Sequence, residues 1–204
     1  MKFFSQKGFT IMELIIVITI FSILSGVVIF RFQDFQSNVN LQNLAQDVAL
    51  QIAQARNDGA GGRIEPRFFN DQPSYGVSFN ISSQGSNKEF TYFFDSGDDQ
   101  KNYIYDDLIS ISPCGENNTE CIDVISITSG DVLESLCVIE TTGGKCTDVD
   151  DVNIVFTRPD LFAFIKSTDL VQSDSFLEAR VTLLSKADQR RTISISRNGF
   201  VGIK

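Results

Sequence analysis

An apolar run near the amino terminus constrains this chain more than any other feature. Phe9 to Phe30 comprises 22 residues with one ionisable side chain, Glu13. As a helix that rises about 1.5 Å per residue, this run is long enough to cross a bilayer core of about 30 Å. Lys2 and Lys7 precede it, and a cationic flank stays on the cytoplasmic side. The sequence therefore predicts one membrane-spanning segment, with all later residues outside the cytoplasm.

The position of Glu13 distinguishes this segment from a signal peptide and from an ordinary anchor. A secretory signal peptide has a small-residue cleavage site after its apolar run, but here Arg31, Phe32 and Gln33 follow. An ordinary membrane anchor explains the length and the lysines. It does not explain Glu13, because an unpaired carboxylate inside a bilayer costs several kcal/mol. An acid at this position therefore indicates a function.

The residues around Glu13 resemble the cleavage and methylation motif of type IV prepilins. Residues 7–14 read KGFTIMEL, so a basic leader, a Gly8-Phe9 junction and Glu13 occur in register with the apolar run. The resemblance implies that a prepilin peptidase cleaves after Gly8 and methylates the new amino terminus at Phe9. It also implies filament assembly, in which Glu13 of one subunit neutralises the Phe9 amine of a neighbour.

The same resemblance implies partners and a location. The partners are other pilin subunits, in a homo- or hetero-filament, the prepilin peptidase and an inner-membrane assembly platform, and no cofactor is implied. Before assembly the subunit would cross the cytoplasmic membrane once, with its head extracytoplasmic. Afterwards it would be part of a cell-surface or periplasmic filament. Residues 44–56 resemble the helix end of minor pilins and of minor pseudopilins of type II secretion.

The helix is expected to continue beyond the membrane. Apolar residues recur at mostly three- and four-residue steps with polar residues between them, which predicts one amphipathic stripe, formed by Phe32, Phe35, Val39, Leu44, Val48, Ile52 and Ala55. The glycine-rich stretch 58–62 predicts a helix end near Asn57. The predicted organisation is a leader (1–8), a transmembrane and filament-core helix (9–30), an amphipathic continuation (31–58) and a β-rich head (59–204).

The sequence of the head predicts short strands separated by turn residues such as Asn198-Gly199. The short spacing favours antiparallel pairing, so the fold class is α+β, with one long helix packed on an antiparallel sheet. The expected strands are 75–81, 90–94, 124–128, 133–140, 152–157, 161–165, 179–184, 192–196 and 200–203.

Four cysteines lie in the second half of the chain, and an even count outside the cytoplasm indicates disulfides. A zinc site is the alternative, but separations of seven and nine residues do not resemble paired Cys-x-x-Cys units, and the chain has no histidine. Of the three possible connectivities, local pairing is preferred. Cys137 and Cys146 flank a hairpin, and Cys114 and Cys121 flank a polar loop.

Acidic loops offer weak candidates for a calcium site. The first group lacks the alternating acceptors and the final glutamate of an EF-hand loop, so a solvated acidic turn is the preferred interpretation. Its members are Asp95, Asp98, Asp99 and Asp106, with Asp148, Asp150 and Asp151 as a second group.

Charge and composition bear on the remaining functions. The formal net charge is −9, and loss of Lys2 and Lys7 on cleavage would make it −11, which disfavours nucleic acid as a partner. A basic bias at the carboxyl end, from Lys186, Arg190, Arg191, Arg197 and Lys204, would supply too few phosphate contacts. The absence of histidine and of nucleophile motifs argues against an enzyme. A filament subunit is the preferred function, and the alternative is a membrane-anchored extracytoplasmic binding module, including a DNA-binding minor pilin.

Overall fold

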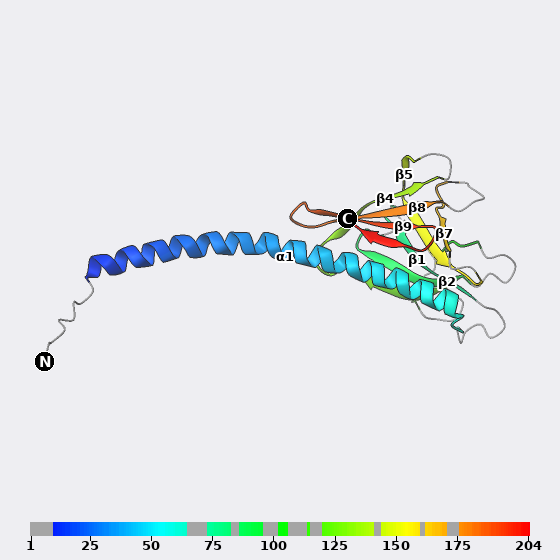
Figure 1. Cartoon of the computed structure of the whole chain (residues 1–204), viewed down its shortest axis with the longest axis horizontal. Coiled ribbons are helices and arrows are strands. Elements are labelled where there is room, and N and C mark those ends of the chain that lie inside the picture. Colours follow the sequence, from blue (N-terminus) through cyan, green and yellow to red (C-terminus); the bar gives the residue numbers. More distant parts are fainter. Residues whose placement is uncertain are drawn as a thin grey trace.

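The computed structural model describes residues 10–64, 73–82, 86–95, 102–105, 114, 120–140, 144–159, 162–170 and 176–204, without the side chains at 28–31, 33 and 34. One helix, α1 (Ile11–Gly61), begins far from the head and ends against it, as Figure 1 shows. All strand pairs are antiparallel. The predicted α+β class is therefore confirmed.

The head contains two five-stranded sheets in its described part. The first has the order β3-β2-β1-β6-β7 and the second the order β10-β9-β8-β4-β5. The strands are β1 (Ser74–Asn80), β2 (Glu89–Asp95), β3 (Cys121–Ser126), β4 (Val132–Ile139), β5 (Cys146–Val149), β6 (Asp151–Phe156), β7 (Ala163–Lys166), β8 (Glu178–Leu184), β9 (Arg190–Ser196) and β10 (Val201–Ile203). The nine predicted strands all have counterparts. The sequence analysis missed β5, a four-residue edge strand with little apolar content, and it did not predict the division into two sheets.

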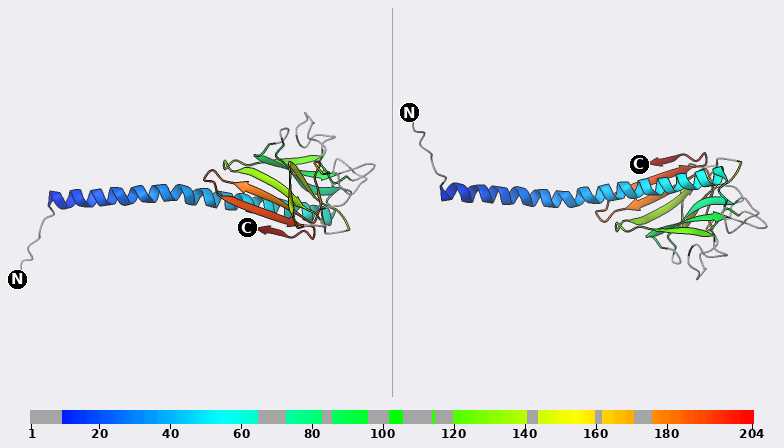
Figure 2. Two further views of the ribbon diagram at one scale, coloured as in Figure 1. Left: turned by 90° about the horizontal axis from the view of Figure 1, so that it is seen from above. Right: turned by 90° about the horizontal axis from the view of Figure 1, so that it is seen from below.

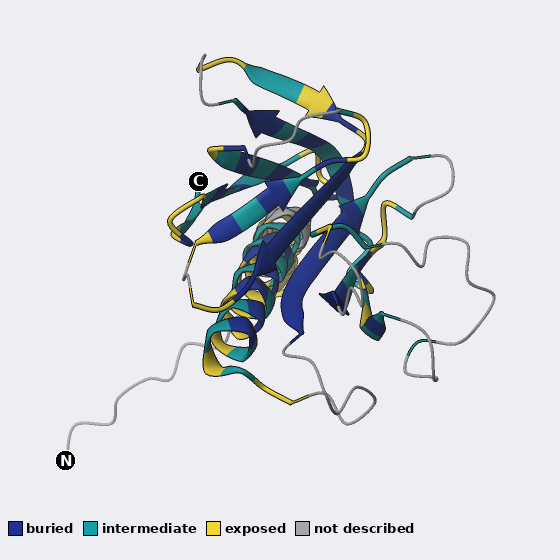
Figure 3. Cartoon of the chain, turned by 90° about the vertical axis from the view of Figure 1, so that its right-hand side faces the viewer, coloured by how far each residue is buried: buried dark blue, intermediate teal, exposed yellow. Residues whose placement is uncertain are grey.

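The second half of α1 forms part of the head's core. Its buried side chains follow steps of four and three residues and are at most 1% exposed: Leu41, Ala45, Val48, Ile52 and Ala55. This stripe contacts strands of both sheets, among them β1, β6 and β9. The two views of Figure 2 show the helix lying along the head, and Figure 3 shows buried residues gathered where the strands face it. The helix therefore packs against both sheets and joins them in one core.

The helix ends at Gly61, one turn later than the predicted end near Asn57. Gly62 terminates it in the left-handed conformation, with φ of 63°, which glycine adopts without steric cost. Gly59 lies within the helix and packs against the backbone of Phe156, where an added Cβ would lie 2.4 Å from the carbonyl oxygen. The first glycine of the run is therefore a packing residue, and the last one is the cap.

Candidate assembly interface

A capping box between Thr10 and Glu13 closes the amino end of α1. The backbone N–H of Glu13 donates to the Thr10 hydroxyl at 3.3 Å, and the backbone N–H of Thr10 donates to Glu13 Oε2 at 3.3 Å. The Thr10 hydroxyl also donates to Oε2. Glu13 therefore has an intrachain role that the sequence analysis missed, although Thr-x-x-Glu before an apolar run is a recognised capping signal.

The predicted processing residues Gly8 and Phe9 lie outside the described residues. Thr10 has an extended backbone, with φ of −83° and ψ of 149°, and the helix follows it directly. The structure thus brings Glu13 against the residue next to Phe9. The predicted pair between Glu13 and the Phe9 amine of a neighbouring subunit stays a prediction.

The first part of α1 is apolar and uncovered by the rest of the chain. Its large apolar side chains from Ile11 to Val27 are 50–79% exposed. Two of the three hydroxyl side chains here, Thr19 and Ser22, donate to carbonyls four residues earlier at 2.7 and 2.8 Å. Their polar groups are thus satisfied within the helix, as an apolar environment requires. A search of the described residues found no helix with the length and apolar character that a membrane span needs.

The helix carries apolar side chains on two opposite faces. Leu41 is fully buried under the head, whereas Phe32 and Leu50, each nine residues from it, are 59% and 67% exposed. Nine residues are two and a half turns at 3.6 residues per turn, so Phe32 and Leu50 lie on the side away from the head. Leu14 precedes Phe32 by five turns and extends this outer face at 56% exposure.

This arrangement corrects the single amphipathic stripe that the sequence predicted. Phe32, Phe35 and Val39 are 59%, 65% and 39% exposed, so they do not join Val48 and Ile52 in the core. The head's buried stripe begins only at Leu41, and the three earlier side chains belong to the outer face. Spacing alone missed this because the step from Val39 to Leu44 is five residues, which turns the later side chains about 140° around the helix from the earlier ones.

Polar contacts hold the head half of α1 at both of its ends. Where the helix leaves the head, Arg191 donates to Asn38 Oδ1 at 3.1 Å and to Gln42 Oε1 at 3.3 Å. At the carboxyl end, Arg158 donates to the carbonyls of Ala60, at 2.9 Å, and Gly61. The last turn of α1 has no basic residue of its own, so Arg158 supplies the cation that this helix end favours.

Asp58 forms a second contact between the helix end and the first sheet. Its carboxylate accepts the Tyr92 hydroxyl at 2.5 Å and pairs with Arg63 at 2.8 Å. Burial, followed by the hydrogen bond to Asp58, raises the pKa of Tyr92 well above its usual value. The bond to Asp58 also raises the pKa of Arg63. This cluster fixes the end of the helix against β2.

The disulfides follow the preferred local pairing. Cys114 is bonded to Cys121 and Cys137 to Cys146, with Cα–Cα distances of 5.0 and 5.6 Å. Cys121 opens β3 and Cys146 opens β5, and each of these strands lies at the edge of its sheet. The bonds therefore attach strands that have only one neighbour in the sheet.

The calcium candidates are only partly described. Asp98, Asp99 and Asp106 lie outside the described residues, and Asp95 is buried with its carboxylate accepting the Tyr103 N–H at 2.9 Å. Asp151, from the second group, is also buried and accepts from Ser167, Thr168 and Asn153. Within the described ranges, no three acidic or cysteine side chains are grouped so that they could hold a metal ion.

The basic residues near the carboxyl end do not form one patch. Arg190 and Arg197 stand at opposite ends of β9, about 23 Å apart at 3.3 Å per residue. Arg190 pairs with Glu134 at 2.7 Å, and Arg191 is bonded to the helix. Two of these three arginines are therefore engaged within the chain and the third lies apart from Arg190, whereas DNA binding needs several cations close together.

Comparison with known proteins identifies a family motif at the amino terminus. Searches of curated proteins and of solved structures found no match to the chain. A family model matches residues 4–29, a range that includes Gly8, Phe9 and Glu13. The matched motif indicates a membrane-anchored precursor of a structural, pilin-type protein that assembles with other subunits. The chain thus carries the prokaryotic N-terminal methylation motif, which is typical of type IV pilins and pseudopilins.

Proposed function

We propose that the chain is a structural subunit of a type IV pilus-like filament. A prepilin peptidase cleaves it after Gly8 and methylates Phe9. The segment from Phe9 to Phe30 then holds the subunit in the cytoplasmic membrane with its head outside. An inner-membrane assembly platform adds the subunit to a filament at the cell surface or in the periplasm, and the subunit has no enzymatic activity of its own.

The outer face of α1 is the observation that carries this proposal. A membrane anchor needs apolar surface only as far as the bilayer extends. Here exposed apolar side chains continue past Phe30 to Phe32, Phe35 and Val39, the last of which stands nine residues, or about 14 Å of helix, beyond Phe30, and Leu50 is exposed further along the helix. Exposed apolar side chains beyond the bilayer favour packing against other proteins, and neighbouring subunits would supply that contact in a filament.

The capping box leaves room for the proposed contact between subunits. All the hydrogen bonds that Glu13 accepts from Thr10 go to Oε2. An ionised carboxylate can accept on both oxygens, so Oε1 is available to a neighbouring amine. A charge buried among apolar helices is tolerated when it is paired and hydrogen-bonded. Glu13 can therefore cap its own helix and pair with the Phe9 amine of another subunit.

Intact-mass measurement tests the proposal. The native protein is isolated from membranes and from filaments sheared off the cells, and the Gly8→Arg variant serves as the uncut control. We expect the native chain to lack residues 1–8 and to carry one added methyl group, whereas the variant keeps its leader and is missing from filaments. A native chain that keeps its full-length mass and never occurs in sheared material would instead support a membrane-anchored binding module.

A further inference from the structure

The guanidinium of Arg197 differs from those of the other arginines whose side chains are described. Each of the others donates to a carboxylate, a side-chain amide or a backbone carbonyl: Arg56, Arg63, Arg158, Arg180, Arg190 and Arg191. Within the described residues, the guanidinium of Arg197 has no such partner, although it belongs to a chain with a net charge of −9. A guanidinium without a described partner, in a chain with excess negative charge, is available to a ligand from outside.

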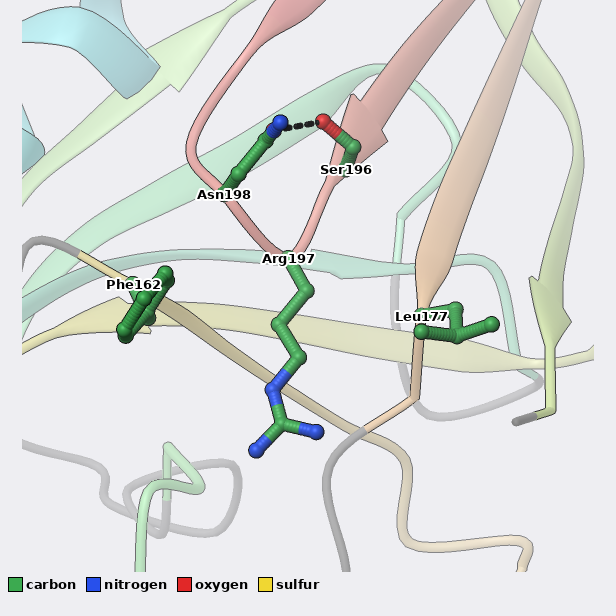
Figure 4. A pocket seen from close by; sticks show the side chains of 5 residues that line it. All are labelled: Phe162, Leu177, Ser196, Arg197 and Asn198. Carbon is green, nitrogen blue, oxygen red and sulfur yellow. Dashed lines mark hydrogen bonds between the residues drawn. The ribbon is translucent and has the colours of Figure 1, made fainter.

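Arg197 lies in a pocket of about 460 Å³ lined by Phe162, Leu177, Ser196 and Asn198. Figure 4 shows its side chain extending between Phe162 and Leu177. These two apolar side chains are 53% and 41% exposed. The pocket thus combines a cation that has no partner among the described residues with apolar walls that those residues leave partly exposed.

Backbone hydrogen bonds hold this pocket in shape. The N–H of Arg197 donates to the Leu177 carbonyl at 2.7 Å, and the Arg197 carbonyl accepts the Ala163 N–H at 2.7 Å. The adjoining turn is closed by the Gly199 N–H, which donates to the Ser196 carbonyl at 2.8 Å. Three chain segments, from both sheets, are therefore fixed relative to one another, and a ligand would find the site already formed.

The side chains that line the pocket indicate which kind of ligand it can bind. A guanidinium presents a planar pair of donors that matches a carboxylate, and the walls favour an apolar group beside it. A polyanion is disfavoured, because one arginine makes few phosphate contacts and the acidic chain repels it. We propose that the pocket binds a peptide segment of a partner protein in which a carboxylate lies beside a large apolar side chain.

The test uses the full chain in detergent micelles and follows the backbone amide signals of Arg197 and Phe200 by NMR. The probes are N-acetylphenylalanine, which has both features, its amide, which lacks the carboxylate, and acetate, which lacks the ring. We expect N-acetylphenylalanine to bind about fivefold more tightly than its amide, as an exposed ion pair worth about 1 kcal/mol allows, and more tightly than acetate, which leaves the apolar walls in water.

Variants distinguish the site from general charge effects. Arg197→Gln should weaken binding of N-acetylphenylalanine about fivefold, whereas Arg180→Gln, which removes an arginine already paired with Glu178, should leave binding unchanged. Both variants should keep the thermal stability of the parent to within a few degrees, because the guanidinium of Arg197 contacts no described partner. No binding of N-acetylphenylalanine, or equal binding by the Arg197→Gln variant, would overturn the proposal. Binding of a DNA oligonucleotide that depends on Arg197 would assign the pocket to nucleic acid instead.

Discussion

The two halves of α1 share one continuous helical backbone and differ in what covers their apolar side chains. From Ile11 to Val27 these side chains are at least half exposed, whereas from Leu41 to Ala55 the inner face is at most 1% exposed. Apolar burial contributes about 25 cal/mol per Å², so the head half is stabilised by its own chain. The first half gains nothing comparable within the chain. Its stability depends on a membrane or on other subunits.

Replacement of Glu13 should have the largest effect, and it acts on the first half alone. Removing one partner of a buried ion pair costs about 3–5 kcal/mol, so Glu13→Val should still be cleaved after Gly8 but should be depleted from sheared filaments by two orders of magnitude or more. Immunoblots of membrane and sheared fractions measure this.

Glu13→Gln separates the two roles of this side chain. Glutamine can still accept the Thr10 N–H in a capping box, but it carries no charge for a neighbouring amine. If the charge pairs subunits, Glu13→Gln should be depleted as strongly as Glu13→Val. Assembly of the glutamine variant at the parent level would show that Glu13 acts only through the cap.

A matched pair in the second half tests whether the two faces of the helix have separate roles. Ile52 is 1% exposed and Leu50 is 67% exposed, two positions apart. Ile52→Ala should lower the free energy of unfolding of the head by about 2–5 kcal/mol, because it leaves a cavity in the core. Leu50→Ala should change it by less than about 0.5 kcal/mol but should reduce the amount of filament. Denaturant unfolding of the full chain in detergent, with filament yield measured in parallel, checks both. Equal losses of stability would refute the two-faced helix.

The sequence predicted features that depend on local pattern. The long helix, nine of the ten described strands and the local disulfide pairing follow from periodicity, turn residues and cysteine spacing. The methylation motif was recognisable because Gly8, Phe9 and Glu13 stand in fixed register with the apolar run.

Features that depend on distant contacts could not be predicted in the same way. The exposed apolar side chains of Phe32, Phe35 and Val39 can be separated from the buried stripe only once Leu41 is known to be its first side chain. The cap supplied by Arg158 and the pocket around Arg197 join segments that are far apart in the sequence. The Thr10–Glu13 cap, in contrast, could have been predicted from the local Thr-x-x-Glu spacing. It was missed because Glu13 was interpreted only as a partner for another subunit.

Two glycines near the end of α1 test how closely the head half packs. At Gly59 an added Cβ would lie 2.4 Å from the Phe156 carbonyl oxygen, whereas at Gly61 it would meet nothing within 4 Å. Gly59→Ala should therefore lower the free energy of unfolding by about 1–3 kcal/mol, as overpacking does. Gly61→Ala should be neutral or should raise stability by up to about 1 kcal/mol, because alanine favours the helix. Thermal unfolding of both variants decides this, and an unaffected Gly59→Ala protein would mean that the helix end is not pressed against β6.

Tyr92→Phe should have the smallest effect and tests the contact between the helix end and the first sheet. The variant loses the hydroxyl that donates to Asp58, but Asp58 keeps its pair with Arg63 at 2.8 Å. At pH 7 the loss should be about 1 kcal/mol, the usual contribution of one hydrogen bond.

The pH dependence of this change has a definite sign. Burial and the bond to Asp58 raise the pKa of Tyr92 in the folded state. The unfolded chain, with a tyrosine pKa of about 10, therefore ionises first as the pH rises. The stabilisation from Tyr92 is complete below about pH 10 and is lost as the pH rises beyond it, because only the unfolded state then releases this proton. Between pH 9 and 11 the free energy of unfolding of Tyr92→Phe should thus fall less steeply than that of the parent. The two free energies should become equal toward pH 11. Parallel slopes in denaturant unfolding across that range would show that Tyr92 ionises in the folded protein as readily as in the unfolded chain, and that Asp58 holds the helix end through Arg63 alone.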